Sequence, residues 1–106
     1  MAKDNGIVVL VTWEGVTKEI YEDVMKKINL EGDSPKGLVS HIAALDKDDV
    51  RVIDVWKSEE DFKNYVQNRL MPVIGTLVKG EPNVETYPLE ALFIPVRQVK
   101  KIKTKI

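Results

Sequence analysis

The 106-residue chain has no cysteine and only one histidine. Without cysteine it forms no disulfide and offers no thiolate, which fits the reducing cytoplasm where we expect the protein to reside. No apolar stretch follows a basic N-terminal region, so we expect neither a signal peptide nor a membrane span. Phosphate loops, nucleophile elbows and histidine–carboxylate clusters at metal-binding spacing are also missing, and we expect no metal.

The charge is nearly balanced overall but unevenly distributed. The formal net charge is −1, which argues against a nucleic-acid partner, because binding to phosphates requires a basic excess. Residues 96–106 contain basic side chains and no acid. We therefore divide the chain into one acidic domain, residues 1–95, and a basic tail, residues 96–106. The tail is either a solvated terminus or an arm lying on the acidic body of a partner subunit.

The first part of the chain predicts a buried strand followed by a helix. Gly6–Trp13 is an almost uninterrupted run of β-branched and aliphatic residues, typical of a central strand. In Lys18–Leu30 apolar residues recur every four positions and charged residues lie between them, which indicates an amphipathic helix. Thr17 stands where an N-cap is expected.

Two extended runs, Leu38–Leu45 and Val50–Trp56, predict a hairpin closed by an acidic turn. A turn of even length pairs residues whose numbers add up to ninety-five, which places His41 directly opposite Asp54. The same register places Val39 opposite Trp56 on that face. This face would therefore carry a polar pair among apolar neighbours, which is typical of a site or of a structural tether.

The second half predicts another helix and an edge strand. Ser58 and the acids after it mark a helix start, and Pro72 is expected to end or kink the first segment before Val73–Val78. The last strand, from about Asn83 to Leu89, contains Pro88 and belongs at a sheet edge or a bulge.

The resulting order, βαββαβ, predicts an α+β fold of the ferredoxin-like type, with two helices on one face of a four-stranded antiparallel sheet. The other face has no cover, yet its hairpin positions are too apolar to face water. This predicts a homodimer packed through the sheet face. The positions assigned to it are Leu38, Ser40, Ile42, Ala44, Arg51, Ile53 and Val55.

Three strings add a family resemblance: Gly37 to Ile42 (GLVSHI), Val52 to Trp56 (VIDVW) and Ser58 to Phe62 (SEEDF). With the element order, they resemble the dimeric α+β barrel proteins of the antibiotic-biosynthesis-monooxygenase-like group. The resemblance implies a pocket between the sheet and the helices. The group that the chain resembles includes cofactor-independent oxygenases, haem-degrading enzymes and small isomerases. The haem-degrading members use a histidine on the second long helix, and none lies in Ser58–Val78. Haem is therefore disfavoured and no cofactor is expected.

The predicted pair permits proton transfer. A carboxylate at Asp54 would orient one ring nitrogen of His41 and free the other to act as a base. Trp56, Trp13 and Tyr65 would form the walls of a pocket for a small apolar or aromatic ligand. Arg69, one turn beyond Tyr65, would neutralise an anionic substrate at the mouth.

Three functions remain open on the sequence. The first is a cofactor-independent monooxygenase acting on a phenolic or quinol-like substrate. The second is an isomerase or lyase that uses His41 as its base. The third is a non-catalytic ligand-binding or assembly module, in which His41 and Asp54 only lock the hairpin.

Overall fold

A computed structural model describes residues 6–75, 77–78 and 80–95, so the predicted basic tail at 96–106 lies outside the described residues. The element order confirms the predicted βαββαβ arrangement. The elements are β1 (Ile7–Glu14), α1 (Lys18–Ile28), β2 (Leu38–Asp46), β3 (Asp49–Trp56), α2 (Glu59–Tyr65), η1 (Val66–Leu70), α3 (Met71–Ile74) and β4 (Asn83–Pro88).

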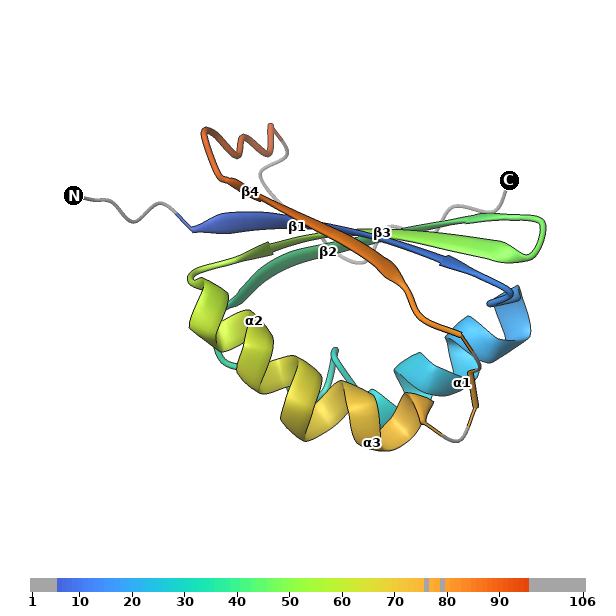
Figure 1. Cartoon of the computed structure of the whole chain (residues 1–106). Coiled ribbons are helices and arrows are strands. Elements are labelled where there is room, and N and C mark those ends of the chain that lie inside the picture. The colour runs from blue at the N-terminus through green and yellow to red at the C-terminus, as the bar shows by residue number, and fades with distance from the viewer. Residues whose placement is uncertain (1–5, 76, 79, 96–106) are drawn as a thin grey trace.

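The four strands form one antiparallel sheet in the order β2-β3-β1-β4. The strand β1 is central, as predicted, and β4 is an edge strand that ends at Pro88. In the part of the chain that the structure describes, all helices lie on one face of this sheet (Figure 1). The ferredoxin-like fold predicted from the sequence is confirmed.

Side-chain caps set the start of both long helical segments. The Thr17 hydroxyl accepts a hydrogen bond from the Ile20 amide at 3.2 Å, and the Ser58 hydroxyl accepts one from the Asp61 amide at 3.1 Å. Each cap satisfies an amide that has no partner within the helix. Asn29 adopts the left-handed conformation (φ 60°) and ends α1 slightly before the predicted position.

The second helical segment continues through Pro72, so the expectation that Pro72 ends it was wrong. The helical piece expected over Val73–Val78 reaches only Ile74. Pro72 lies in the first turn of α3, where its ring fits the helix. The irregularity lies just before it. At the end of η1 the Met71 amide donates to the Val66 carbonyl, five residues back, which is the hydrogen bond of a π turn. Such a turn accommodates one more residue than an α-helical turn.

The hairpin register is confirmed from Ser40 onward, with His41 opposite Asp54. It shifts between Leu38 and Ser40, where a β-bulge inserts one residue. Leu38 therefore lies opposite Trp56, and the prediction that Val39 does so was wrong. Val39 is 46% exposed instead. A period-two pattern alone gives no signal for such an inserted residue.

The bulge also changes which side chains lie on the open face of the sheet, the face that the helices do not cover. Leu38 was assigned to this face, but it packs against the core between sheet and helices. Val55 lies on the open face by alternation and is already buried within the chain, at 6% exposure. In the hairpin, the large apolar side chains left exposed on this face are Ile42, at 57%, and Ile53, at 41%.

The core lies between the sheet and the helices, and it fixes the place of the site. Its buried side chains come from both layers, namely Val9, Val24, Ile28, Trp56, Tyr65 and Ile74. Burial of each large apolar side chain contributes about 1.5–3 kcal/mol. Within the described residues, no helix has the length and apolar character needed to cross a bilayer.

Candidate functional site

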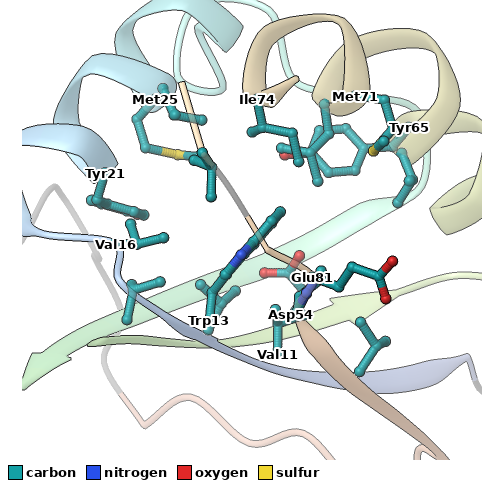
Figure 2. A pocket seen from close by; sticks show the side chains of 18 of the residues that line it. Val11, Trp13, Val16, Tyr21, Met25, Asp54, Tyr65, Met71, Ile74 and Glu81 are labelled. Atoms are coloured by element: carbon teal, nitrogen blue, oxygen red, sulfur yellow. The ribbon is translucent and has the colours of Figure 1, made fainter. Parts of the chain in front are cut away.

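A cavity of about 350 Å³ lies between the sheet and the helical layer. Most of its lining is aliphatic or aromatic, as is usual for small-molecule pockets. Figure 2 shows Trp13 rising from β1, while Tyr21 and Met25 approach from α1 and Tyr65 from α2. Met71, Glu81 and Val84 line it and are exposed, so the cavity reaches the surface between α3 and β4.

Asp54 is the polar centre of the cavity wall and is only 5% exposed. One carboxylate oxygen lies 2.7 Å from Nδ1 of His41, across the hairpin. The other accepts a hydrogen bond from the indole nitrogen of Trp56 at 3.2 Å. The predicted juxtaposition of His41 and Asp54 is confirmed. A buried carboxylate requires such partners, because removal from water strongly disfavours an unpaired charge.

Tyr21 completes the arrangement, and the sequence analysis did not single it out as a site residue. Its hydroxyl lies 2.8 Å from Nε2 of His41. The two rings are parallel within 1°, which suits a hydrogen bond in the plane of the imidazole. The available signal was a tyrosine on the apolar face of the amphipathic helix Lys18–Ile28. Periodicity does not reveal that this face crosses the sheet beside His41.

The hydrogen-bond partners assign the protons. A carboxylate only accepts, so Nδ1 of His41 carries a hydrogen and donates to Asp54. In the neutral imidazole Nε2 is then an acceptor, and the Tyr21 hydroxyl donates to it. The expectation that this second nitrogen is free to meet a ligand was wrong. Tyr21 occupies it, through the 2.8 Å contact of its hydroxyl with Nε2.

Burial and the charge of Asp54 raise the pKa of Tyr21 from 10.0 to about 12. Tyr21 is therefore a neutral phenol at neutral pH and can donate to a neutral His41. Its oxygen still has lone-pair capacity to accept a proton while its own proton passes to Nε2. This makes Tyr21 a link between the cavity and His41 and not an independent anionic base.

Tyr21 and His41 also line a second hollow, of about 580 Å³, between α1 and the start of β2. Its other lining residues include Glu22, Lys26 and Asn29, which are exposed. The Tyr21–His41 pair thus lies between an apolar interior cavity and a polar outer hollow.

The other predicted wall residues lie in different places. Trp13 and Tyr65 line the cavity, as expected for walls. Trp56 is completely buried and does not line it. Its ring packs against Phe62 and Tyr65, at centroid distances of 5.8 and 5.1 Å. Trp56 therefore supports Asp54 from behind, and its assignment as a wall was wrong.

Arg69 does not reach the cavity, so its assignment to the mouth was also wrong. Its guanidinium donates to the Ile28 carbonyl at 2.6 Å and lies 3.9 Å from Asp33. It thereby ties the second helical segment to the end of α1.

The π turn explains the displacement of Arg69. In a regular helix the face that begins with Phe62, Tyr65 and Val66 would continue at positions 69 and 70. The extra residue of the π turn shifts this face by one position, so that it continues at Leu70 and Met71. Arg69 is turned away and a methionine takes its place.

Among the described residues, no three histidine, aspartate or glutamate side chains converge as a metal site would require. The cavity wall contains one histidine, His41, and two acidic side chains, Asp54 and Glu81, among the described residues.

No protein-family model matches the sequence. No curated protein matches it either. Solved structures do match, at low sequence identity. A ferredoxin-fold protein from Listeria monocytogenes, related to antibiotic biosynthesis monooxygenases, is 19% identical, with a TM-score of 0.60 over 87% of this chain and 60% of that chain.

Two further matches are oxygenases from Streptomyces. The monooxygenase ActVA-Orf6 of Streptomyces coelicolor, in complex with nanaomycin D, is 16% identical, with a TM-score of 0.59 over 86% of this chain and 93% of that chain. SnoaB, a cofactor-independent oxygenase from Streptomyces nogalater, is 16% identical, with a TM-score of 0.58 over 88% of this chain and 98% of that chain. The resemblance stated from the sequence is confirmed at the level of the fold.

The raised pKa of Tyr21 predicts a loss of stability in alkali. The unfolded state loses this proton near pH 10 and the folded state near pH 12, so stability falls with rising pH between these values. In Tyr21→Phe this contribution is absent. We expect urea denaturation to show a smaller loss of unfolding free energy between pH 9 and pH 11.5 in this variant than in the wild type. Equal losses would contradict the assigned environment of Tyr21.

Proposed function

We propose that the protein binds a small, largely apolar aromatic molecule in the cavity and removes a proton from it through Tyr21, His41 and Asp54. The carrying observation is the continuous hydrogen-bonded chain, with contacts of 2.8 and 2.7 Å, that begins at the wall of an apolar cavity. A chain of this kind is suited to general acid–base catalysis, and it leaves the cavity free for the ligand.

The first step is deprotonation of a phenolic hydroxyl. The ligand gives its proton to the Tyr21 oxygen while Tyr21 gives its own proton to Nε2 of His41. The resulting imidazolium lies 2.7 Å from the Asp54 carboxylate, so the positive charge forms next to a fixed negative one. Trp56 holds the other carboxylate oxygen, which keeps Asp54 in place.

The reaction that we propose is oxygenation of a phenol or quinol by dioxygen, without a cofactor. The phenolate gives electrons to dioxygen and a ring carbon forms a bond to oxygen, which yields a peroxide. Loss of the proton from that carbon then breaks the O–O bond and forms a carbonyl. For 1-naphthol the sum is one naphthol and one dioxygen to one naphthoquinone and one water. The two Streptomyces oxygenases with this fold support the choice of reaction.

We also propose that the protein acts as a homodimer through the open face of the sheet. Ile42 and Ile53 are exposed there at 57% and 41%. After β4 the chain lies on the side of the sheet away from the helices (Figure 1), and it exposes three consecutive apolar residues, Leu92, Phe93 and Ile94. A second copy would cover both surfaces, since a two-fold interface joins the same patch on each subunit.

Substituting Asp54 by Asn tests the proton-transfer proposal. The amide keeps the shape but cannot stabilise an imidazolium, so we expect the rate of dioxygen uptake with 1-naphthol to fall roughly 10²- to 10⁴-fold. Binding of 1-naphthol, measured by calorimetry, should change much less. The matched control is Asp46→Asn in the same hairpin, because Asp46 is exposed and pairs only loosely with Arg51, at 3.6 Å.

Unchanged turnover in Asp54→Asn would contradict the assigned chain. Saturable binding of 1-naphthol to a wild-type protein that takes up no dioxygen would contradict the oxygenase and favour a binding module. Conversion of an enolisable ketone without dioxygen uptake would favour an isomerase.

The dimer proposal predicts a solution mass of about twice the 12.0 kDa chain mass. Ile53→Asp places a charge in the proposed interface, and light scattering should show a shift toward the monomer. Leu45→Asp is the matched control, because Leu45 is similarly exposed, at 39%, but lies on the face that carries His41. A wild-type protein that remains monomeric at high concentration would overturn the proposal.

A further inference from the structure

Tyr65 is a buried side chain whose polar group has no partner. It is only 7% exposed and lines the cavity from the helical side (Figure 2). Among the described residues its hydroxyl makes no hydrogen bond, unlike that of Tyr21. The indole nitrogen of Trp13, across the cavity on β1, is a buried atom that has no hydrogen-bond partner in the described part of the chain. Two donors of the cavity wall are thus left unused by the protein itself.

A buried donor without a partner reduces stability, and the indole nitrogen of Trp13 is such a donor. The Tyr65 hydroxyl makes no hydrogen bond within the described part of the protein, so a phenylalanine at position 65 would lose none there. Folding therefore gives no reason for the Tyr65 hydroxyl. Binding does, because a ligand oxygen in the cavity would accept from it. Burial and the negative charge of Asp54 both raise the pKa of Tyr65, so its hydroxyl keeps its proton and remains a donor.

The charges of the wall decide which kind of acceptor fits. Asp54 and Glu81 line the cavity, whereas no lysine or arginine does so among the described residues. Arg69, which the sequence assigned to an anionic substrate, is bound to the Ile28 carbonyl instead. An anionic oxygen would be placed in a buried site next to a carboxylate without a counter-charge, which is strongly unfavourable. An uncharged oxygen meets no such penalty.

We propose that the Tyr65 hydroxyl, with the Trp13 indole nitrogen across the cavity from it, forms a subsite for an uncharged acceptor oxygen, a carbonyl, on the ligand. The inference rests on the proposed function, because it assigns the second oxygen of a molecule whose ionisable hydroxyl meets Tyr21. Tyr21 and Tyr65 line the same cavity as Asp54, so one ligand can meet both side chains. The ligand class is a neutral hydroxyaryl ketone, in which Tyr65 selects the ketone.

Two ligands that differ only in the ketone test this subsite. The first is 5-hydroxy-1-tetralone, and the second is 5,6,7,8-tetrahydro-1-naphthol, which has the same rings and hydroxyl but no carbonyl. Calorimetry at neutral pH should show that the wild type binds the tetralone roughly 2- to 10-fold more tightly, as one net hydrogen bond allows. An acid of the same skeleton, 5,6,7,8-tetrahydro-1-naphthoic acid, should bind more weakly than either.

Tyr65→Phe should abolish the preference for the tetralone and leave binding of the tetrahydronaphthol nearly unchanged. Its melting temperature without ligand should equal or exceed that of the wild type, because the substitution removes an unpartnered hydroxyl. A purely structural role of Tyr65 would lower it. The matched control is Tyr87→Phe, which removes an exposed hydroxyl that donates to Glu85 and should retain the full preference.

A preference that survives in Tyr65→Phe, equal binding of both ligands to the wild type, or tighter binding of the acid would each overturn the subsite. The proposed function would stand in those cases, because its test is proton removal from a bound phenol. If neither phenol binds to the wild type, the subsite and the proposed function are both wrong.

Discussion

The buried carboxylate of Asp54 is the constraint on which the rest of the site depends. It holds His41 across the hairpin and Trp56 along its own strand, and Trp56 packs in turn against the helical layer. A buried charge is tolerated only while each oxygen has a donor, so the hairpin register, the orientation of the imidazole and the central aromatic packing are coupled. Tyr21 then attaches α1 to the same network. The site is thus continuous with the core and is not an addition to it.

Much of this arrangement could be predicted from the sequence, because it depends on local rules. The hairpin turn has an even number of residues, and this sets the strand pairing that places His41 opposite Asp54. The hydroxyl caps Thr17 and Ser58 marked the helix starts. The residues whose positions were predicted wrongly were misplaced for one of two reasons: a single inserted residue shifted the pattern, or their position depends on how the helices pack on the sheet. The bulge at Val39 and the π turn before Met71 each shift a periodic pattern by one position, and no periodicity announces such a shift. The contact of Tyr21 with His41 depends on how α1 crosses the sheet.

The cavity combines an apolar surface with a small number of polar groups, and these groups fall into two kinds. Tyr21, His41 and Asp54 satisfy one another, which gives them a defined geometry before any ligand arrives. The donors of Trp13 and Tyr65 have no hydrogen-bond partner among the residues that the structure describes. Proteins retain such unfavourable features where they serve a function, and sites of this kind trade stability for recognition. The paired groups suit chemistry and the unpaired groups suit recognition.

The π turn at Val66–Leu70 affects how this chain is compared with other structures of the same fold. Because the turn contains one additional residue, a structure with a regular helix here aligns correctly only if a gap is opened within the turn. At identities of 16–19% an ungapped alignment would pass unnoticed. It would assign Arg69 to the cavity wall and remove Met71 from it. Any transfer of residue roles between these proteins therefore has to follow the backbone and not the numbering.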